Sequence, residues 1–531
     1  MDNHEHSLNM DNYRMENLPV RDKAPLEQKI AYIGGPLAIL AFILIMWVIK
    51  IPFLETIDST VLSDKVLPFY KSMGAQAFSQ ANIAMLAVFV SAVILWMTQA
   101  IPNYLTSLIL IITLVLTNVL PEKVAYAQLG HKIMWLNILS FILASMLAAT
   151  GVAKRFALWF IVKYGHSAKS ILISFILINV VLSAFISATT AKAAILLPIF
   201  MVIATVYGAR GGKDKNNFGR NIVLQNLFCI NIAAGAFVTG SGANLLAASL
   251  ISGAIDGSIF FNDWLIVAFP VSVSLLFVGY FVATKWIFPL KEEEKTPSIA
   301  GGMDALNKEL NKLGPITFNE IKAVVIFCTI LALWATDKYH GVSATAVAFV
   351  GAIVALMPKI GVVKWNDVDI PWHLLLFSAG AYTLGAGFKR TGLPSLAVNA
   401  GFDAMGLGDT TPFWALYLLL TGSMLASALV FQSKTMRTML FVPIAIGVAQ
   451  KFGYPVLSLA LPVALLIEHV YVFPFNSKPA LLLYSTDQYS FTDAAKFGLV
   501  MLVIGWGTSI VMGETWYRYL GYTPNGVFGL F

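Results

Sequence analysis

Residues 183–194 read Ser-Ala-Phe-Ile-Ser-Ala-Thr-Thr-Ala-Lys-Ala-Ala, a polar cluster of hydroxyls and one lysine inside a long apolar run. Residues 426–438 read Ala-Ser-Ala-Leu-Val-Phe-Gln-Ser-Lys-Thr-Met-Arg-Thr and have the same character. Such clusters are unfavourable in a soluble core, because the buried polar groups would need partners. In a membrane protein they are typical of a solute site. The two stretches therefore predict a transport site built from both halves of the chain.

The composition supports a membrane protein. The chain has 531 residues, of which 58% are hydrophobic and 12% are charged, and its mean hydropathy is +0.76. Soluble domains carry roughly 25% charged residues, and many apolar runs here reach the ~20 residues that cross a bilayer. We expect an all-α integral membrane protein in the lipid bilayer of the plasma membrane. No nucleophile, metal or nucleotide motif is present, so we expect no enzyme, no cofactor, no metal site and no nucleic-acid partner.

The apolar segments predict about eleven transmembrane helices. The runs 170–206 and 411–450 are too long for one span and are interrupted by polar residues, so we interpret each as a re-entrant hairpin. Basic loops at 154–169 and 210–220 lie on the same side as the leader, which the positive-inside rule makes cytoplasmic. The predicted domains are a cytoplasmic leader (1–29), a first span and connector (30–81), a first repeat (82–288), a cytoplasmic linker (289–318) and a second repeat (319–531).

The two repeats resemble one another at an offset of about 240 residues. The matched residues are Trp96 and Trp334, Trp135 and Trp372, Ser187 and Ser433, Lys192 and Thr438, and Pro198 and Pro443. An odd number of spans in each repeat would invert the second repeat relative to the first. Inverted repeats with a binding site at the midplane are typical of alternating-access transporters.

A broken helix is expected after each hairpin. Residues 235–244, Gly-Ala-Phe-Val-Thr-Gly-Ser-Gly-Ala-Asn, place glycines and hydroxyls halfway along an apolar segment. Residues 472–480, Val-Phe-Pro-Phe-Asn-Ser-Lys-Pro-Ala, do the same in the second half. Breaks of this kind free backbone carbonyls and helix N-termini, which bind cations and carboxylates. Two hairpin tips and two broken helices would form one polar site.

These motifs resemble the divalent anion/sodium symporter (DASS) family of di- and tricarboxylate carriers. Residues 96–102, Trp-Met-Thr-Gln-Ala-Ile-Pro, are similar to the family's W-x-T-E-x-I-P. Residues 187–189 and 433–435 resemble its two S-N-T hairpin tips, and residues 239–244 resemble its T-G-T-x-x-N break. The resemblance covers roughly residues 82–516. It implies a scaffold domain and a moving transport domain, an elevator-type motion, a homodimer, and a dicarboxylate bound between the tips.

The departures from the family pattern concern charge. In sodium-coupled relatives the two tips help to form sodium sites, but here Ala188 and Lys434 replace the two asparagines. Further cations stand at Lys192, Arg437 and Lys478. A fixed positive charge would repel sodium by several kcal/mol at low dielectric. We therefore hypothesise that these side chains stand in for sodium ions, which predicts sodium-independent exchange of succinate, malate or 2-oxoglutarate, with citrate as a further candidate.

The predicted substrate-binding residues lie at the tips and the breaks: Ser187, Ala188, Thr189, Lys192, Thr239, Gly240, Asn244, Ser433, Lys434, Thr435, Arg437, Asn476, Ser477 and Lys478.

Alternatives remain open for several of these residues. Lys192 would otherwise extend to the cytoplasmic face, and the tip hydroxyls would only cap helix ends. Glu468 would pair with Lys478 or Arg437, or carry a proton. At the level of function, the alternative is sodium- or proton-coupled symport of di- or tricarboxylates or of sulfate.

Overall fold

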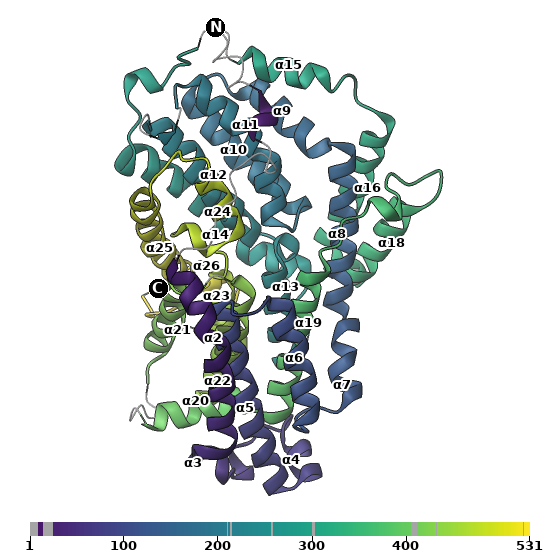
Figure 1. Ribbon diagram of the computed structural model, residues 1–531, viewed down its shortest axis with the longest axis vertical. Coiled ribbons are helices and arrows are strands. Elements are labelled where there is room, and N and C mark those ends of the chain that lie inside the picture. The colour runs from purple at the N-terminus through teal and green to yellow at the C-terminus, as the bar shows by residue number, and fades with distance from the viewer. Residues whose placement is uncertain are drawn as a thin grey trace.

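The computed structural model describes residues 9–13, 25–209, 211–212, 215–255, 257, 259–299, 303–404, 411–431, 433–523 and 525–530. Every regular element in these ranges is helical (Figure 1). The prediction of an all-α integral membrane protein is confirmed. Most of the predicted leader, and Arg210 and Lys213 of the second basic loop, lie outside the described residues.

The helices of the first half are α2 (Pro25–Ile43), α3 (Pro52–Glu55), α4 (Leu67–Met73), α5 (Ala75–Thr98), α6 (Asn103–Leu116), α7 (Glu122–Ala127), α8 (Lys132–Thr150), α9 (Val152–Tyr164), α10 (Ala168–Phe185), α11 (Thr189–Val206), α12 (Asn217–Gly235), α13 (Gly242–Ala254) and α14 (Phe261–Val282).

Those that follow are α15 (Asp304–Lys312), α16 (Phe318–Ala335), α17 (Asp337–His340), α18 (Ala344–Leu356), α19 (Trp372–Thr391), α20 (Leu393–Ala404), α21 (Phe413–Ser427), α22 (Lys434–Lys451), α23 (Val456–Leu465), α24 (Lys478–Tyr484), α25 (Phe491–Glu514) and α26 (Trp516–Tyr519). Short 3₁₀ or π segments are η1 (Met10–Tyr13), η3 (Leu44–Val48), η4 (Ser59–Val61), η5 (Gln128–Gly130), η7 (Val238–Gly240), η8 (Ala283–Ile287), η9 (Glu292–Glu294), η10 (Trp365–Asp367) and η11 (Pro474–Asn476).

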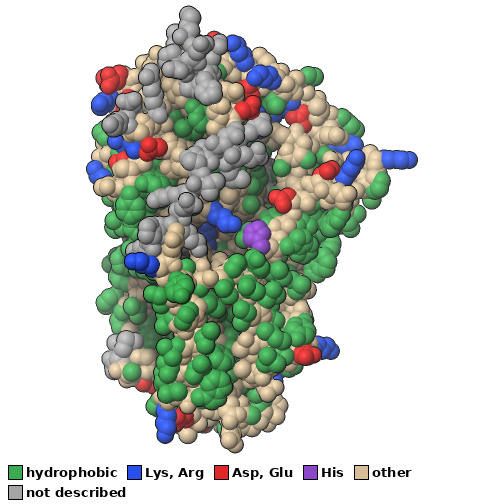
Figure 2. All heavy atoms as spheres, viewed as in Figure 1, with side chains coloured by type: hydrophobic (Ala, Val, Ile, Leu, Met, Phe, Trp, Pro, Cys, Tyr) green, Lys and Arg blue, Asp and Glu red, His purple; other side chains and the backbone are tan. Residues whose placement is uncertain are grey.

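Seven helical segments within the described ranges are long and apolar enough to cross a membrane, and six shorter apolar helices accompany them. Figure 2 shows a broad belt of hydrophobic side chains in the lower half of this face, with most charged side chains above it or at the lower end. A belt of this kind suits contact with lipid. The segment Gln28–Val48 is only 11% buried, whereas Thr189–Val206 is 72% buried, so α11 belongs to the interior. The count of eleven spans stays a prediction.

The two halves contain the same order of elements. The pair α5 and α6 corresponds to α16 and α18, α8 to α19, and α10 to α14 correspond to α21 to α25. One local contact is reproduced in both halves: Trp96 donates its indole N–H to the carbonyl of Asn103 (3.4 Å), and Trp334 donates to that of Ala344 (2.9 Å). Each acceptor is the first residue of the next long helix. The equivalence supports the predicted repeat, while its inversion across the membrane stays a prediction.

The halves are interlocked by packing. The helix α6 lies against α19, and its counterpart α18 lies against α8. Helices of the two halves also pack against each other around the interruptions, where α11 contacts α24 and α22 contacts α13. Each hairpin arm therefore contacts the broken helix of the other half.

The predicted interruptions are confirmed. Residues 186–188 are non-helical between α10 and α11, and residues 428–431 and 433 are non-helical between α21 and α22. The breaks between α12 and α13 and between α23 and α24 each contain one 3₁₀ turn, η7 or η11. Gly240 is required by close packing at the first break, because a Cβ there would lie 2.2 Å from the carbonyl oxygen of Ala234.

The linker is tied to α9. Arg155 forms an ion pair with Glu320 and donates to the carbonyl oxygens of Gly314 (2.8 Å) and Leu313 (2.9 Å). Glu320 also accepts the backbone N–H of Thr317 (2.6 Å), whose hydroxyl caps α16 in return. This reciprocal cap fixes the start of α16 beside α9.

Candidate functional site

Four helix N-termini follow the interruptions of the chain. They belong to the second arms of the two hairpins, α11 and α22, and to the short helices after the two breaks, α13 and α24. The unpaired N–H groups of a helix N-terminus attract negative charge. Because α11 contacts α24 and α22 contacts α13, residues from both halves border the same polar region.

Lys192 lies in the first turn of α11 and is fully buried, with 0% of its surface exposed. Its Nζ donates to the hydroxyl of Ser183 (2.6 Å) at the end of α10 and to the carbonyl of Ile230 (3.2 Å) in α12. The side chain therefore joins both arms of the first hairpin to the first broken helix. The alternative in which Lys192 extends to the cytoplasmic face is wrong, because its amine is enclosed by these oxygens.

Arg437 holds the corresponding place in the second half and is also 0% exposed. Its Nε donates to the hydroxyl of Ser427 (2.8 Å), and its other nitrogens donate to the carbonyls of Met424 (2.6 Å) and Ile467 (2.9 Å). Within the described residues it forms no ion pair with Glu468. The carbonyls that bind Arg437 lie at or just beyond a helix end, where unpaired carbonyls favour a cation, whereas the carbonyl of Ile230 that binds Lys192 lies within α12.

The two cations are equivalent when the hairpins are aligned on their prolines. Lys192 stands six residues before Pro198, and Arg437 stands six residues before Pro443. Each binds one serine from the last turn of the preceding arm and carbonyls from the adjacent broken helix. The match of Lys192 with Thr438 is therefore wrong by one residue. It aligned the hairpins on Ser187 and Ser433, but Ser187 stands eleven residues before its proline and Ser433 only ten.

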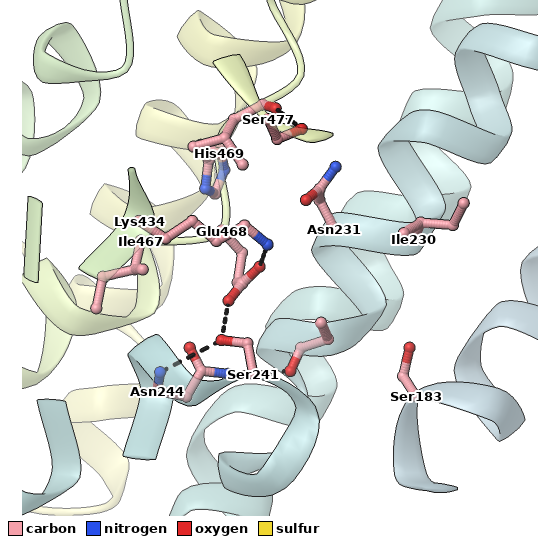
Figure 3. A network of polar contacts seen from close by, with 12 residues as sticks. Ser183, Ile230, Asn231, Ser241, Asn244, Lys434, Ile467, Glu468, His469 and Ser477 are labelled. Carbon is pink, nitrogen blue, oxygen red and sulfur yellow. Dashed lines mark hydrogen bonds and ion pairs between the residues drawn. The ribbon is translucent and has the colours of Figure 1, made fainter. Parts of the chain in front are cut away.

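Glu468 is the acidic centre of the region (Figure 3). It lies just beyond α23, is 1% exposed, and forms an ion pair with Lys434 and a hydrogen bond from the hydroxyl of Ser241. These partners come from the tip of the second hairpin and from the first break. Glu468 thus pairs with Lys434, not with Lys478 or Arg437, since Lys434 reaches it from the first residue of α22.

Three serines cap helices at the interruptions, and of the tip hydroxyls for which capping was the alternative only Ser433 does so among the described residues. Ser433 accepts the backbone N–H of Met436, Ser241 that of Asn244, and Ser477 that of Ala480, each at 3.3 Å. Capping leaves the outer turn of each helix open toward the site, so it is compatible with contact to a solute.

The other tip residues are less engaged. Ala188 occupies the N-cap position of α11, which therefore has no side-chain cap. In the part of the chain that the structure describes, Ser187, Thr189 and Thr435 are partly buried and form no side-chain hydrogen bond. Lys478 is the first residue of α24; it is exposed and has no ion-pair partner among the described residues.

Two asparagines fasten the breaks. Asn244 donates to the carbonyls of Ala234 (3.0 Å) and Phe237 (3.1 Å), and Asn476 donates to that of Ala428 (2.7 Å). Both are 0% exposed. At the first break, the Thr239 hydroxyl and the Oδ1 of Asn244 have no hydrogen-bond partner among the described residues.

The important residues that the binding-site prediction left out are Ser183, Ser427, Ser241 and Glu468. For the first two, a signal was present, because a serine precedes each buried cation by nine or ten residues. No signal identified Ser241 and Lys434 as partners of Glu468, because these contacts cross helix breaks.

A comparison with known families identifies the chain. The family described as "Sodium:sulfate symporter transmembrane region" matches residues 73–523. The chain belongs to this family. This match confirms the resemblance to the DASS family. This chain is therefore a multi-span membrane transporter.

The relatives are distant but cover most of the chain. A sodium-dependent dicarboxylate transporter, SdcS, of Staphylococcus saprophyticus is 26% identical over 448 residues, covering 79% of this chain and 84% of that protein. A sodium-dependent high-affinity dicarboxylate transporter 3 of Caenorhabditis elegans is 24% identical (76% and 77%). A chloroplastic dicarboxylate transporter 1 of Arabidopsis thaliana is 25% identical (82% and 78%).

Proposed function

We propose that this transporter exchanges C4–C5 dicarboxylates such as succinate, malate and 2-oxoglutarate without sodium. The observation that carries the proposal is the pair of equivalent buried cations, Lys192 and Arg437, one in each hairpin. They place fixed positive charge at both interrupted regions of a protein whose family is described by sodium coupling.

The oxygen atoms around Lys192 and Arg437 support the proposal that these side chains take the place of sodium ions. In transporters with broken helices, unwound carbonyls and helix C-terminal ends coordinate the coupling cation. Here the oxygens near both breaks, the hydroxyls of Ser183 and Ser427 and the carbonyls of Ile230 and Ile467, accept side-chain N–H groups. A sodium ion at the same oxygens would meet a permanent positive charge, which disfavours its binding.

The charge of the region fits a dianion. Lys434 is neutralised by Glu468, so the buried groups leave two positive charges, on Lys192 and Arg437. Lys478 is exposed, and solvent screens its charge. A dicarboxylate would bring the total to zero. Without it, moving the site through the membrane interior would cost roughly 2.5–3.5 kcal/mol per cation, so the empty carrier would cross slowly and exchange would dominate.

The remaining features follow the family resemblance. Dicarboxylates are the transported anions in the names of three relatives. We propose an elevator-type movement of the domain that contains both hairpins, a homodimer, and a location in the plasma membrane. The domain limits and the fourteen predicted binding residues belong to the same proposal.

Sodium- or proton-coupled symport is the second candidate. Two relatives are named sodium-dependent. The unpartnered Thr239 hydroxyl and Asn244 Oδ1 are buried acceptors at the first break, of the kind that a cation would bind. Under this alternative, Lys192 and Arg437 would serve only to hold the hairpins together.

Counterflow in proteoliposomes separates the two. Uptake of labelled succinate would be measured into vesicles that are empty or preloaded with unlabelled succinate, each with and without a sodium or proton gradient. We expect uptake only into preloaded vesicles and no response to sodium. Sodium-driven uptake into empty vesicles would refute the proposal and favour symport.

A further inference from the structure

We propose that Glu468 is a built-in carboxylate that fills one carboxylate position of the binding region and thereby restricts the transporter to substrates with two negative charges. The inference rests on the dicarboxylate exchange proposed above and adds a residue that determines the charge of the substrate.

The surroundings of Glu468 are those of a bound anion. One carboxylate oxygen pairs with the amine of Lys434, and the other accepts the hydroxyl of Ser241. Ser241 is the N-cap of α13, so the carboxylate also lies at the positive end of a thirteen-residue helix. Figure 3 shows Lys434 and Ser241 converging on the carboxyl group from different elements. A cation, a hydroxyl and a helix N-terminus are the groups that would bind a carboxylate of a substrate.

The second half of the chain carries this charged pair, whereas the first half carries neutral residues. When the carbonyls that bind the two cations, those of Ile230 and Ile467, are aligned, the position equivalent to Glu468 is Asn231 on α12. On the alignment of the hairpin prolines, the position equivalent to Lys434 is Thr189, the first residue of α11. Asn231 donates to the carbonyl of Leu227 (2.9 Å) within its own helix, and its Oδ1 has no partner among the described residues. A cation and an anion therefore occur together in one half, which leaves the net charge of the site unchanged.

The other neighbours of Glu468 leave Lys434 as its counter-ion. Arg437 lies near Glu468 but donates its N–H groups to the backbone carbonyls of Ile467 and His469 (2.9 and 3.4 Å), not to the carboxylate. His469 is 4% exposed, and neither ring nitrogen has a hydrogen-bond partner among the described residues. Both Glu468 and His469 border an enclosed cavity of about 20 Å³, which is room for one water molecule. No second cation among the described residues bonds to the carboxylate.

The consequence concerns tricarboxylates. With Glu468 ionised, the buried groups carry two net positive charges, and a third substrate carboxylate would meet an occupied position and a repelling charge. Without Glu468, Lys434 would be unpaired, the net charge would be three, and the amine, Ser241 and the α13 N-terminus would be open to a third carboxylate. The wild type should therefore take citrate only in its doubly charged form.

The experiment measures inhibition of labelled succinate exchange by unlabelled succinate and by citrate. Glu468→Ala removes the carboxylate and opens its space, and Glu468→Gln removes the charge while keeping the size. The double variant Lys434→Ala with Glu468→Ala removes both charges and restores the net charge of the wild type. Asp403→Ala on α20, which removes the exposed partner of Lys451 at the end of α22, is the control.

We expect the citrate-to-succinate ratio of inhibition constants to fall at least tenfold in Glu468→Ala, less in Glu468→Gln, and to return toward the wild-type value in the double variant. Asp403→Ala should leave it unchanged. An unchanged ratio in the folded single variants overturns the inference, as does an equal fall in the double variant.

A measurement on the wild type covers the case in which the variants fail to fold. Between mildly acidic and neutral pH citrate passes from two charges to three, whereas succinate is already largely a dianion, so inhibition by citrate should weaken as the pH rises through this range and inhibition by succinate should not. Citrate inhibition that does not change with pH overturns the inference alone. Absence of succinate exchange in the wild type overturns the proposed function and the inference with it.

Discussion

If the protein is the exchanger proposed above, replacing Lys192 by methionine should convert it toward a carrier that also returns empty. The side chain keeps its length but loses the buried charge that Ser183 and Ile230 enclose. The positive charge that the empty site carries then falls from two to one. Because each such charge costs roughly 2.5–3.5 kcal/mol in the membrane interior, net efflux should speed up by about 70- to 400-fold, at 1.36 kcal/mol per factor of ten.

The assay is efflux of labelled succinate from proteoliposomes, with and without unlabelled succinate outside. The quantity compared is the rate of net efflux divided by the rate of exchange. In Lys192→Met this ratio should rise, since the empty carrier moves faster while the loaded one acquires a net negative charge. The control is Lys163→Met on α9, whose amine is exposed and lies 5.0 Å from the centre of the Trp159 ring.

The reasoning would be refuted by an unchanged ratio in a Lys192→Met protein that remains monodisperse. An equal rise in Lys163→Met would also refute it, because that would reflect total charge and not the site. The folding check is needed because the serine hydroxyl and the carbonyl lose a buried donor, which costs about 1–3 kcal/mol for each group left without a partner.

Three further predictions concern the supports of the site. Gly240→Ala should lower the yield of folded protein on size exclusion, because a Cβ at 2.2 Å from a carbonyl oxygen forces the first break apart, whereas Gly253→Ala in α13 meets nothing within 4 Å and should be tolerated. Ser427→Ala should lower the melting temperature in detergent by removing an acceptor of a buried guanidinium, at a cost of about 1–3 kcal/mol. Arg155→Ala should destabilise the protein by about 3 kcal/mol and speed proteolysis of the linker, while loss of the exposed Lys291–Glu293 pair should not.

The chemistry of single segments was predictable from the sequence. The positions of both hairpin interruptions and both broken helices follow from polar residues inside apolar runs, since such residues cannot continue a buried helix without partners. Lys192 and Arg437 were also singled out from the sequence, and the structure buries both at the interruptions; their contact with substrate stays a prediction. All of these features can be recognised from the composition of a stretch of about ten to fifteen residues.

Contacts across the breaks were not predictable. Helical periodicity gives the direction of a side chain only while the helix continues, and Glu468 is separated from Lys434 by the rest of α22, by α23 and by the turn after it. The same limit applies to Lys478. It is the first residue of α24 and its side chain is exposed, and nothing in the residues around it determines in which direction the side chain points.

The buried cations also explain how the interruptions are stabilised. A helix that stops inside a membrane leaves carbonyls without donors, and each unsatisfied group costs several kcal/mol in lipid. Arg437 supplies donors to such carbonyls, those of Met424 and Ile467, and each cation also donates to a serine on the preceding arm. A bound sodium ion could meet the same need, but only while it stays bound, whereas a side chain meets it throughout the transport cycle. In the proposed mechanism, sodium independence and the stability of the empty hairpins are thus two consequences of one substitution, so a variant that restores a sodium site should need sodium to fold as well as to transport.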